Sequence, residues 1–170
     1  MRRTKWVERE FDFRLPVGVF PCVVERLRGT PARLEELTRE IPSPVLTASR
    51  EGAWSIQEHA GHLLDLDELH EGRLEDYAQR LKTLRAADMT NRKTFDAGHN
   101  HARLEELLAG FRAARESFVR RLEALSEAEI AASALHPRLQ KPMRVIDMAH
   151  FVAEHDDHHL ATITELSRPG

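Results

Sequence analysis

Residues 55–84 read SIQEHAGHLLDLDELHEGRLEDYAQRLKTL and predict the longest helix of the chain. Ser55 and Glu58 have the spacing of a capping box, in which the serine caps the first turn and the glutamate reaches back to it. Residues then recur at alternating intervals of four and three, the pattern of a helix-bundle seam. This stripe consists of Ile56, Ala60, Leu63, Asp67, His70, Leu74, Tyr77, Leu81 and Leu84. A helix of this length spans roughly 45 Å, so we expect it to run along the whole bundle.

A second helical segment is predicted ahead of it, over about residues 17–41. It is interrupted near Thr30, which would cap a second piece of helix with Pro31 in its first turn. Runs of alternating β-branched residues are missing from the chain, and helix-forming Leu, Ala, Glu and Arg dominate. The sequence therefore predicts an all-α fold.

Two more long helices are expected in the second half of the chain, over about residues 100–125 and 143–167. Ser126 opens a further short helix by the same capping logic. Between this short helix and the last long one we expect a loop that contains Pro137 and Pro142. The sum is a four-helix bundle with short extra helices in its connections.

The length of 170 residues fits one domain, and we expect an N-terminal arm over residues 1–16 and the bundle over residues 17–170. The net charge of −3 gives no basic excess that would favour nucleic acid. No apolar run approaches the roughly 20 residues that a membrane span needs, and the charged N-terminus is unlike a signal peptide. Cys22 stands alone, so no intrachain disulfide can form, and we expect a buried structural thiol. These features predict a cytoplasmic protein. As its partner we expect a small-molecule substrate.

Histidines gather in two tight groups, His59 with His62 and His155 with His158 and His159. On a helical wheel of residues 143–167, His155 and His159 fall on one edge of the apolar stripe, and His158 falls outside it. Two histidines four residues apart project from one face of a helix, which is a standard half of a metal site. This pair is therefore a candidate for binding a divalent metal ion.

A third ligand would come from the helix over residues 55–84, which offers His59, His62, Asp67 and His70. Periodicity alone leaves the choice open and slightly favours His59. If this helix and the last one are antiparallel, His62 lies at about the height of His155 and His159. That arrangement is an up-down-down-up bundle, with residues 86–99 as the crossover.

Two motifs in the chain resemble those of the DinB-like metalloenzymes, a superfamily of four-helix bundles. Residues 54–63 have the family's tryptophan, a glutamate four residues later and a His-Leu pair eight residues later. Residues 155–159 read HDDHH and match its H-x-x-H-H motif. The resemblance implies that the metal ligands are His62, His155 and His159. One departure is that the glutamine often found shortly after the last histidine is missing here.

The resemblance also implies an up-down-down-up bundle, frequent homodimers and a metal in a cleft at one end. The expected cofactor is a divalent transition metal (Zn, Ni or Fe). Characterised relatives include S-transferases and isomerases that also use a low-molecular-weight thiol. Three neutral histidines leave positions open on such an ion, which can then activate a water or a thiol. The expectation is therefore a metal-dependent enzyme of the hydrolase or thiol S-transferase type.

Two aspartates have more than one interpretation. Asp156 lies between the two ligands of the last helix, where it could orient an imidazole, act as a base or only form a salt bridge. Asp67 and His70 could line the same cavity, but we favour a buried polar pair that fixes the helix register.

Two rival functions remain open. The spacing Asp67-x-x-His70 and Asp156-x-x-His159 superficially resembles that of a di-iron carboxylate bundle, but the further carboxylates of such a site have no clear candidates. The other rival is a non-catalytic, dimeric bundle that binds a metal or another ligand.

Overall fold

The computed structural model describes residues 3–49 and 52–168, so the outer ends of both predicted regions, residues 1–2 and 169–170, lie outside it. Its long helices are α1 (Phe20–Arg28), α2 (Thr30–Thr38), α4 (Ile56–Ala78), α6 (Leu104–Glu123) and α8 (Val145–Leu166). Its shorter elements are α3 (Ser43–Leu46), α5 (Arg92–Asp96), α7 (Glu127–Ile130), β1 (Ser133–His136), β2 (Lys141–Arg144) and the 3-10 turns Trp6–Glu8, Val17–Val19 and His99–His101.

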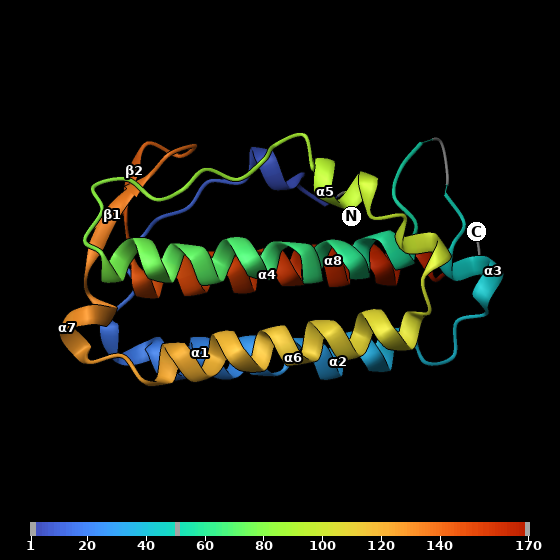
Figure 1. The fold of residues 1–170 in the computed structure, drawn as a ribbon, viewed down its shortest axis with the longest axis horizontal. Coiled ribbons are helices and arrows are strands. Elements are labelled where there is room, and N and C mark those ends of the chain that lie inside the picture. The colour runs from blue at the N-terminus through green and yellow to red at the C-terminus, as the bar shows by residue number, and fades with distance from the viewer. Residues whose placement is uncertain (1–2, 50–51, 169–170) are drawn as a thin grey trace.

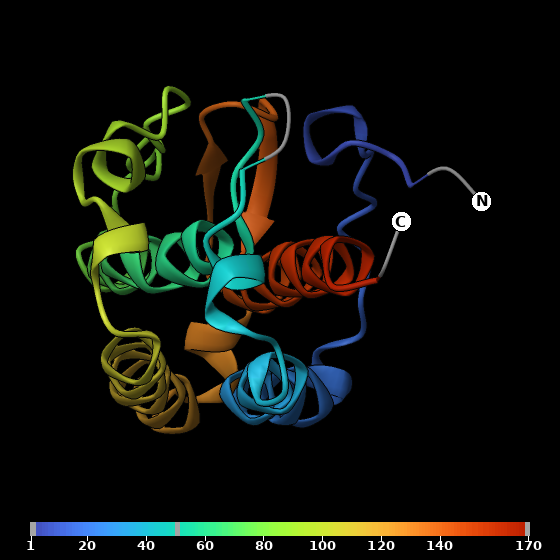
Figure 2. The ribbon, with the colours of Figure 1, turned by 90° about the vertical axis from the view of Figure 1, so that its right-hand side faces the viewer.

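The long helices form the predicted four-helix bundle (Figures 1 and 2). α1 and α2 follow one another end to end and make one edge, and α4, α6 and α8 make the other three. Figure 1 shows α4 and α6 running in the direction opposite to α1–α2 and α8, so the bundle is up-down-down-up. α4 and α8 are therefore antiparallel neighbours, and the connection after α4 crosses back along the bundle before α6 begins.

The apolar core falls into two clusters along the bundle axis. One lies toward the β1–β2 end and includes Leu27, Phe118 and Val152. The other lies toward the α3 end and includes Leu34 and Phe111. The seam residues of α4 contribute to both clusters, and their burial is the main favourable contribution to folding.

A layer of buried polar side chains separates the two clusters. We call it the polar layer, and it consists of Thr30, Asp67, Arg115 and Asp156, one each from α2, α4, α6 and α8. The Arg115 guanidinium donates from Nη2 to Asp67 Oδ1 at 2.9 Å and forms an ion pair with Asp156. Thr30 Oγ1 donates to Asp156 Oδ2 at 2.9 Å. All four helices are thus joined by one hydrogen-bonded network.

A third layer of irregular chain covers α4 and α8 on the side away from α1, α2 and α6 (Figures 1 and 2). It is made of the N-terminal segment, the connection between α4 and α6, and the antiparallel β1–β2 hairpin. The Trp6 ring packs edge-on against Phe151 and His155 of α8, with centroids 4.8 and 5.0 Å away. No helix among residues 3–49 and 52–168 is long and apolar enough to cross a membrane.

The main error in the sequence-based helix boundaries is at the end of α4, which stops at Ala78 instead of reaching Leu84. Arg80 adopts a left-handed backbone with φ of 55°, and this conformation ends the helix. Leu81 is exposed. Leu84 is buried, but it lies beyond the helix and beside strand β1, where its N–H donates to the Leu135 carbonyl at 3.0 Å. The alternating pattern was thus continued by chance beyond the helix.

Three smaller expectations were also wrong. The loop with Pro137 and Pro142 is a β-hairpin, in which four-residue strands are too short to show an alternating pattern. Thr30 caps nothing, because it is already helical and its hydroxyl belongs to the polar layer. Cys22 is exposed on α1, since the apolar face of this helix runs through Phe20, Val23, Val24 and Leu27 instead.

Candidate metal centre

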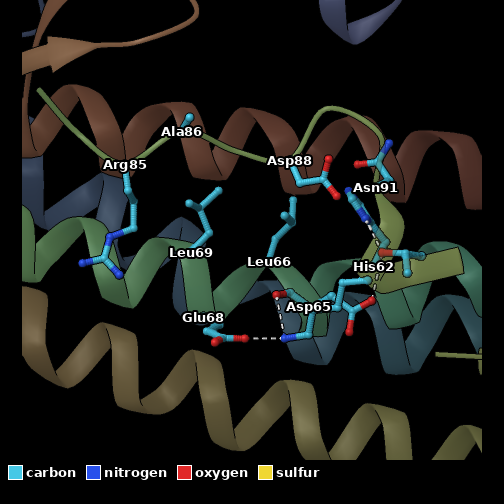
Figure 3. Close-up of a pocket in the computed structure, with 11 residues that line it drawn as sticks. His62, Asp65, Leu66, Glu68, Leu69, Arg85, Ala86, Asp88 and Asn91 are labelled. Atoms are coloured by element: carbon cyan, nitrogen blue, oxygen red, sulfur yellow. Dashed lines mark hydrogen bonds and ion pairs between the residues drawn. The ribbon is translucent and has the colours of Figure 1, made fainter. Parts of the chain in front are cut away.

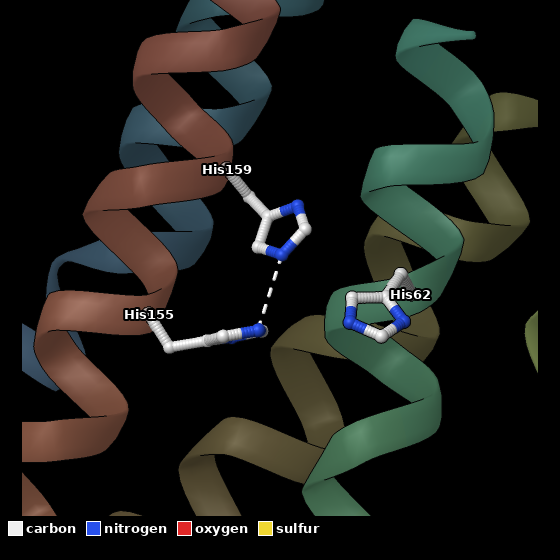
Figure 4. A group of neighbouring side chains, drawn as sticks. All are labelled: His62, His155 and His159. Carbon is white, nitrogen blue, oxygen red and sulfur yellow. Dashed lines mark hydrogen bonds between the residues drawn. The ribbon is translucent and has the colours of Figure 1, made fainter. Parts of the chain in front are cut away.

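Three histidines from two helices meet between α4 and α8. His62 lies in the second turn of α4, and His155 and His159 lie one turn apart on α8. Each is at most 7% exposed, and their ligand atoms all lie within 4.8 Å of one another. Figure 4 shows the three imidazoles directed into the space between the two helices. The antiparallel arrangement brings them to the same height.

The separation of the nitrogens suits a metal ion. His155 Nε2 and His159 Nε2 are 3.1 Å apart. Two nitrogens bound at about 2.0–2.1 Å to one tetrahedral zinc ion lie roughly 3.3 Å apart. The remaining separations between the ligand nitrogens are no more than 4.8 Å. The donor set therefore fits one ion bound by three nitrogens.

The protonation state of the imidazoles suits the same role. Burial lowers the pKa of His62 to about 4, even though Asp65 acts in the opposite direction. Burial also lowers the pKa of His155 and His159 well below the ordinary value, and the neighbouring histidines lower it further. At neutral pH all three are uncharged, which is the form that binds a metal.

His62 is oriented by a chain of hydrogen bonds through Thr94 to Asp65. Its Nδ1–H donates to Thr94 Oγ1 at 2.9 Å, and the Thr94 hydroxyl donates to Asp65 Oδ2 at 2.9 Å. His99 Nε2–H donates to the same Asp65 oxygen at 2.8 Å. Because Nδ1 carries the proton, Nε2 is the nitrogen with the free lone pair. Such carboxylate-supported imidazoles are typical of metal sites.

Gly61 makes room for this chain. A Cβ at this position would overlap the imidazole of His99, which packs directly against the α4 backbone. Glycine in a helix interior costs roughly 1 kcal/mol relative to alanine. At this position the missing side chain allows His99 to reach Asp65.

His159 is oriented by His59. The two Nδ1 atoms are 2.8 Å apart and hydrogen-bonded, and the tautomer in which His159 Nδ1–H donates leaves Nε2 of His159 free for a metal. His59 is therefore next to the three histidines without belonging to the group that shares one point. Trp54 packs against His62 with centroids 4.6 Å apart and shields that side of the site.

The structure places the two aspartates of the sequence analysis in the polar layer. Asp156 is fully buried, accepts from Arg115 and Thr30, and has no described hydrogen bond to a histidine. The favoured pairing of Asp67 with His70 is wrong, because Arg115 pairs with Asp67. Since Arg115 holds both carboxylates, the di-iron interpretation has lost the residues on which it depended.

His70 lies instead at the wall of a cavity. This cavity has a volume of about 520 Å³ and extends from the three histidines along α4. Trp6, Trp54, Leu66, Leu69 and Phe151 line it, and His70 Nδ1 is buried there without a partner among the described residues. A neighbouring cavity of about 360 Å³ shares His62, Leu66 and Leu69 with it and is covered by residues 85–91 (Figure 3). A cavity of this size can hold a small molecule.

Sequence reasoning missed the supporting residues because they lie in segments without a regular pattern. Thr94 and His99 belong to the connection between α4 and α6, which was expected to be a crossover only. The spacing of Asp65 could have indicated its role, since it lies three residues after His62 and so on a neighbouring part of the same helix surface. Gly61 beside a histidine in a strong helix was the other usable signal, because a helical glycine often marks a close approach.

Comparisons with known proteins agree with this architecture. Among proteins with curated descriptions, none matches the chain. A solved structure of a Bacillus subtilis protein, YfiT, superimposes with a TM-score of 0.82 over 95% of this chain and 93% of that one, at 20% sequence identity. YfiT is described as a probable metal-dependent hydrolase with an unusual four-helix bundle topology. At this level of identity the likeness shows a common fold.

The family is shown by a match of the sequence itself. The family model of the DinB superfamily matches residues 26–163, which include α4, the three histidines and most of α8. This chain belongs to the DinB superfamily.

Proposed function

We propose that this chain is a metal-dependent enzyme in which His62, His155 and His159 hold one divalent transition-metal ion. The observation that carries the proposal is the convergence of three buried, neutral imidazoles at the inner end of a cavity. Three protein ligands leave coordination positions open, which is the pattern of catalytic sites, whereas structural zinc sites have four protein ligands. Among the described residues no fourth His, Cys, Asp or Glu joins this group.

The chemistry supplied by such a group is activation of a water or a small thiol near neutral pH. We propose a hydrolase or a thiol S-transferase that acts on a small molecule, with Zn, Ni or Fe as the metal and, for the transferase, a low-molecular-weight thiol as co-substrate. The description of YfiT as a probable metal-dependent hydrolase supports the first of these. The homodimer implied by the family resemblance and the cytoplasmic location expected from the sequence stay predictions.

The protein's own residues have definite tasks in this proposal. Thr94 and Asp65 hold the lone pair of His62 toward the cleft. His59 does the same for His159. Trp6 and Trp54 cover the imidazoles and exclude bulk water, which strengthens electrostatic interactions in the site. Asp156 has no task in the site, because it pairs with Arg115 in the polar layer and does not line the cavity.

The test is turnover by protein that has been stripped of metal and reloaded separately with Zn, Ni and Fe(II). A panel of ester and amide hydrolysis and of thiol transfer to electrophiles covers both reaction types. We expect metal to restore turnover, and His62→Ala, His155→Ala and His159→Ala each to abolish it.

The matched control is His150→Ala, on the far face of α8 and outside the histidine cavity, which should keep full activity. Equal turnover with and without metal, or full activity in the three variants, would contradict the proposal. Tight metal binding without turnover on any substrate would favour the rival, a binding bundle.

A further inference from the structure

The end of the cavity away from the three histidines carries a buried positive charge that no described carboxylate contacts. Arg73 lies on α4 eleven residues after His62, is 2% exposed and lines the cavity. Its Nε donates to the Arg85 carbonyl at 3.3 Å, and no ion pair to it is found among residues 3–49 and 52–168. A buried arginine is normally paired, because an isolated charge is costly to remove from water.

The nearby carboxylate of Asp76 is already used. Its two oxygens accept four hydrogen bonds from the backbone N–H and the guanidinium of Arg85, at 2.7–3.1 Å. Arg85 reaches Asp76 from the solvent side, with about half of its side chain exposed. The Arg73 guanidinium therefore remains without a carboxylate in contact.

A second arginine approaches the same place from the hairpin. Arg138 lies in the turn between β1 and β2, and its Nη2 is buried with no partner among the described residues. His136, at the end of β1, has an unpartnered and buried Nε2. All three side chains line the cavity. Burial lowers the pKa of His136 to about 4, and Arg73 and Arg138 lower it further, so the two arginines lie within electrostatic reach of His136.

Arg115 is a buried arginine of the same protein that is paired with carboxylates. It is as buried as Arg73, yet it contacts the carboxylates of both Asp67 and Asp156. Arg73 and Arg138 line the same cavity, and two like charges there repel each other. An oxyanion that enters the cavity would supply the missing partner, with charge-assisted hydrogen bonds to both.

The wall between the two ends of the cavity is apolar. Leu66 and Leu69 lie between His62 and Arg73 on the same face of α4, as Figure 3 shows for the first part of this row. Eleven residues correspond to roughly 16 Å along the helix axis, and an arginine side chain leans back toward the helix N-terminus. A ligand that reaches both ends must therefore be elongated.

We infer that Arg73 and Arg138, with His136, form an oxyanion subsite that holds the carboxylate or phosphate end of an elongated substrate with an apolar middle. The placement of the reacting end at His62, His155 and His159 rests on the proposed function. The binding of the anion itself does not, because it needs only residues at the other end of the cavity.

The test is isothermal titration of metal-free protein at low ionic strength with hexanoate, hexyl phosphate and the neutral hexanamide. We expect either anion to bind at least about tenfold more tightly than the amide, as charge-assisted hydrogen bonds are stronger than neutral ones. Arg73→Gln and Arg138→Gln should each weaken anion binding by about tenfold and leave the amide unchanged. The anion that binds more tightly identifies carboxylate or phosphate as the source.

Arg120→Gln is the matched control, because Arg120 is exposed on α6, outside the cavity, and has no ion pair among the described residues. It should bind both anions as the wild type does. Circular dichroism verifies the fold of each variant, and Arg138→Gln, in a surface hairpin, keeps the test valid if Arg73→Gln unfolds. Equal binding of acid and amide, or wild-type anion binding in both cavity variants, would overturn the inference.

Metal content separates this inference from the proposed function. His62→Ala should lose metal and keep the anion, whereas Arg73→Gln should lose the anion and keep the metal. Loss of anion binding in His62→Ala to the same extent as in Arg73→Gln would contradict a separate oxyanion subsite.

Discussion

The bundle contains two buried polar clusters that differ in how completely their groups are paired. In the polar layer, Arg115 contacts both aspartates and Thr30 donates to one of them. In the cavity beside it, several buried atoms have no partner among the described residues. These atoms are His70 Nδ1, His136 Nε2, Arg138 Nη2 and His155 Nδ1.

This difference separates side chains that hold the fold from side chains that are open to a ligand. A buried polar group without a hydrogen bond costs on the order of 1–3 kcal/mol. The polar layer avoids this cost internally and joins four helices. The cavity carries this cost, and an anion bound at Arg138 and His136 would remove part of it. Burial alone does not distinguish the two clusters, since Arg73 in the cavity is almost as inaccessible to solvent as Arg115 in the polar layer.

The strongest test of this difference is to replace one buried arginine in each cluster. Arg115→Met leaves Asp67 and Asp156 buried without a counter-ion and should lower the free energy of unfolding by about 3–5 kcal/mol. Arg73→Met removes an unpaired charge and should change it by less than about 1 kcal/mol or raise it. Urea denaturation measures both. Similar losses in the two variants would show that the clusters do not differ in this way.

The pH dependence of stability should be dominated by the cavity. Burial lowers the pKa of His70, His155 and His159 well below the ordinary value, so below about pH 6.5 the unfolded chain takes up protons that the fold does not. Stability is therefore full above pH 6.5 and falls on acidification. The slope is at most about 1.4 kcal/mol per pH unit for each such histidine.

The polar layer should act in the opposite direction. One arginine serves two carboxylates there, and burial raises the pKa of Asp67 to about 6. Below that pH the folded state takes up a proton before the unfolded state, which favours the fold and offsets about one histidine. Denaturation of metal-free protein between pH 7.5 and 5 measures the sum. A stability that rises as the pH falls from 7 to 6 would contradict neutral buried histidines.

Two glycines provide a smaller test of the support behind His62. Gly61→Ala forces the Cβ into the ring of His99 and should cost about 1–3 kcal/mol, typical of overpacking, and weaken metal binding. Gly110→Ala, on α6, meets only Leu64 Cδ2 at 3.2 Å and should cost less, because alanine favours the helix. Thermal denaturation and metal titration of the two proteins give the comparison. Unchanged metal affinity in Gly61→Ala would contradict a role of His99 in supporting His62.

Two threonines give the smallest effects and the cleanest division of roles. Thr30→Val removes a donor to Asp156 and should cost about 1–2 kcal/mol of stability without changing metal affinity. Thr94→Val removes the partner of His62 and should weaken metal binding about 10–100-fold. Metal titration and denaturation of both variants are needed. The same metal affinity in the two variants would contradict the assignment of Thr94 to the metal centre.

The helices and the candidate ligands could be predicted because both follow helical periodicity. The four and three spacing of residues 55–78 and the i, i+4 spacing of His155 and His159 depend only on the geometry of one helix. The antiparallel order of α4 and α8 was only a condition for bringing His62 to the height of the other two, and the family resemblance implied it. The family motifs then selected His62, where periodicity slightly favoured His59.

The surroundings of the site could not be predicted, because they depend on contacts between distant segments. Thr94 and His99 come from the crossover connection, Arg138 comes from a hairpin, and neither segment has a repeating pattern. Asp156 appeared to be part of the site because it lies between two candidate ligands in the sequence. Its side chain points into the polar layer, where Arg115 of another helix neutralises it.

The most direct test of the central claim is the metal content of protein purified without a histidine tag, by elemental mass spectrometry. The wild type, His62→Ala, His155→Ala, His159→Ala and the control His150→Ala are measured after loading with Zn, Ni or Fe(II). The account predicts about one metal ion per chain in the wild type and the control, and loss in each of the other three variants. No metal in the wild type, or equal metal in all five proteins, would contradict it.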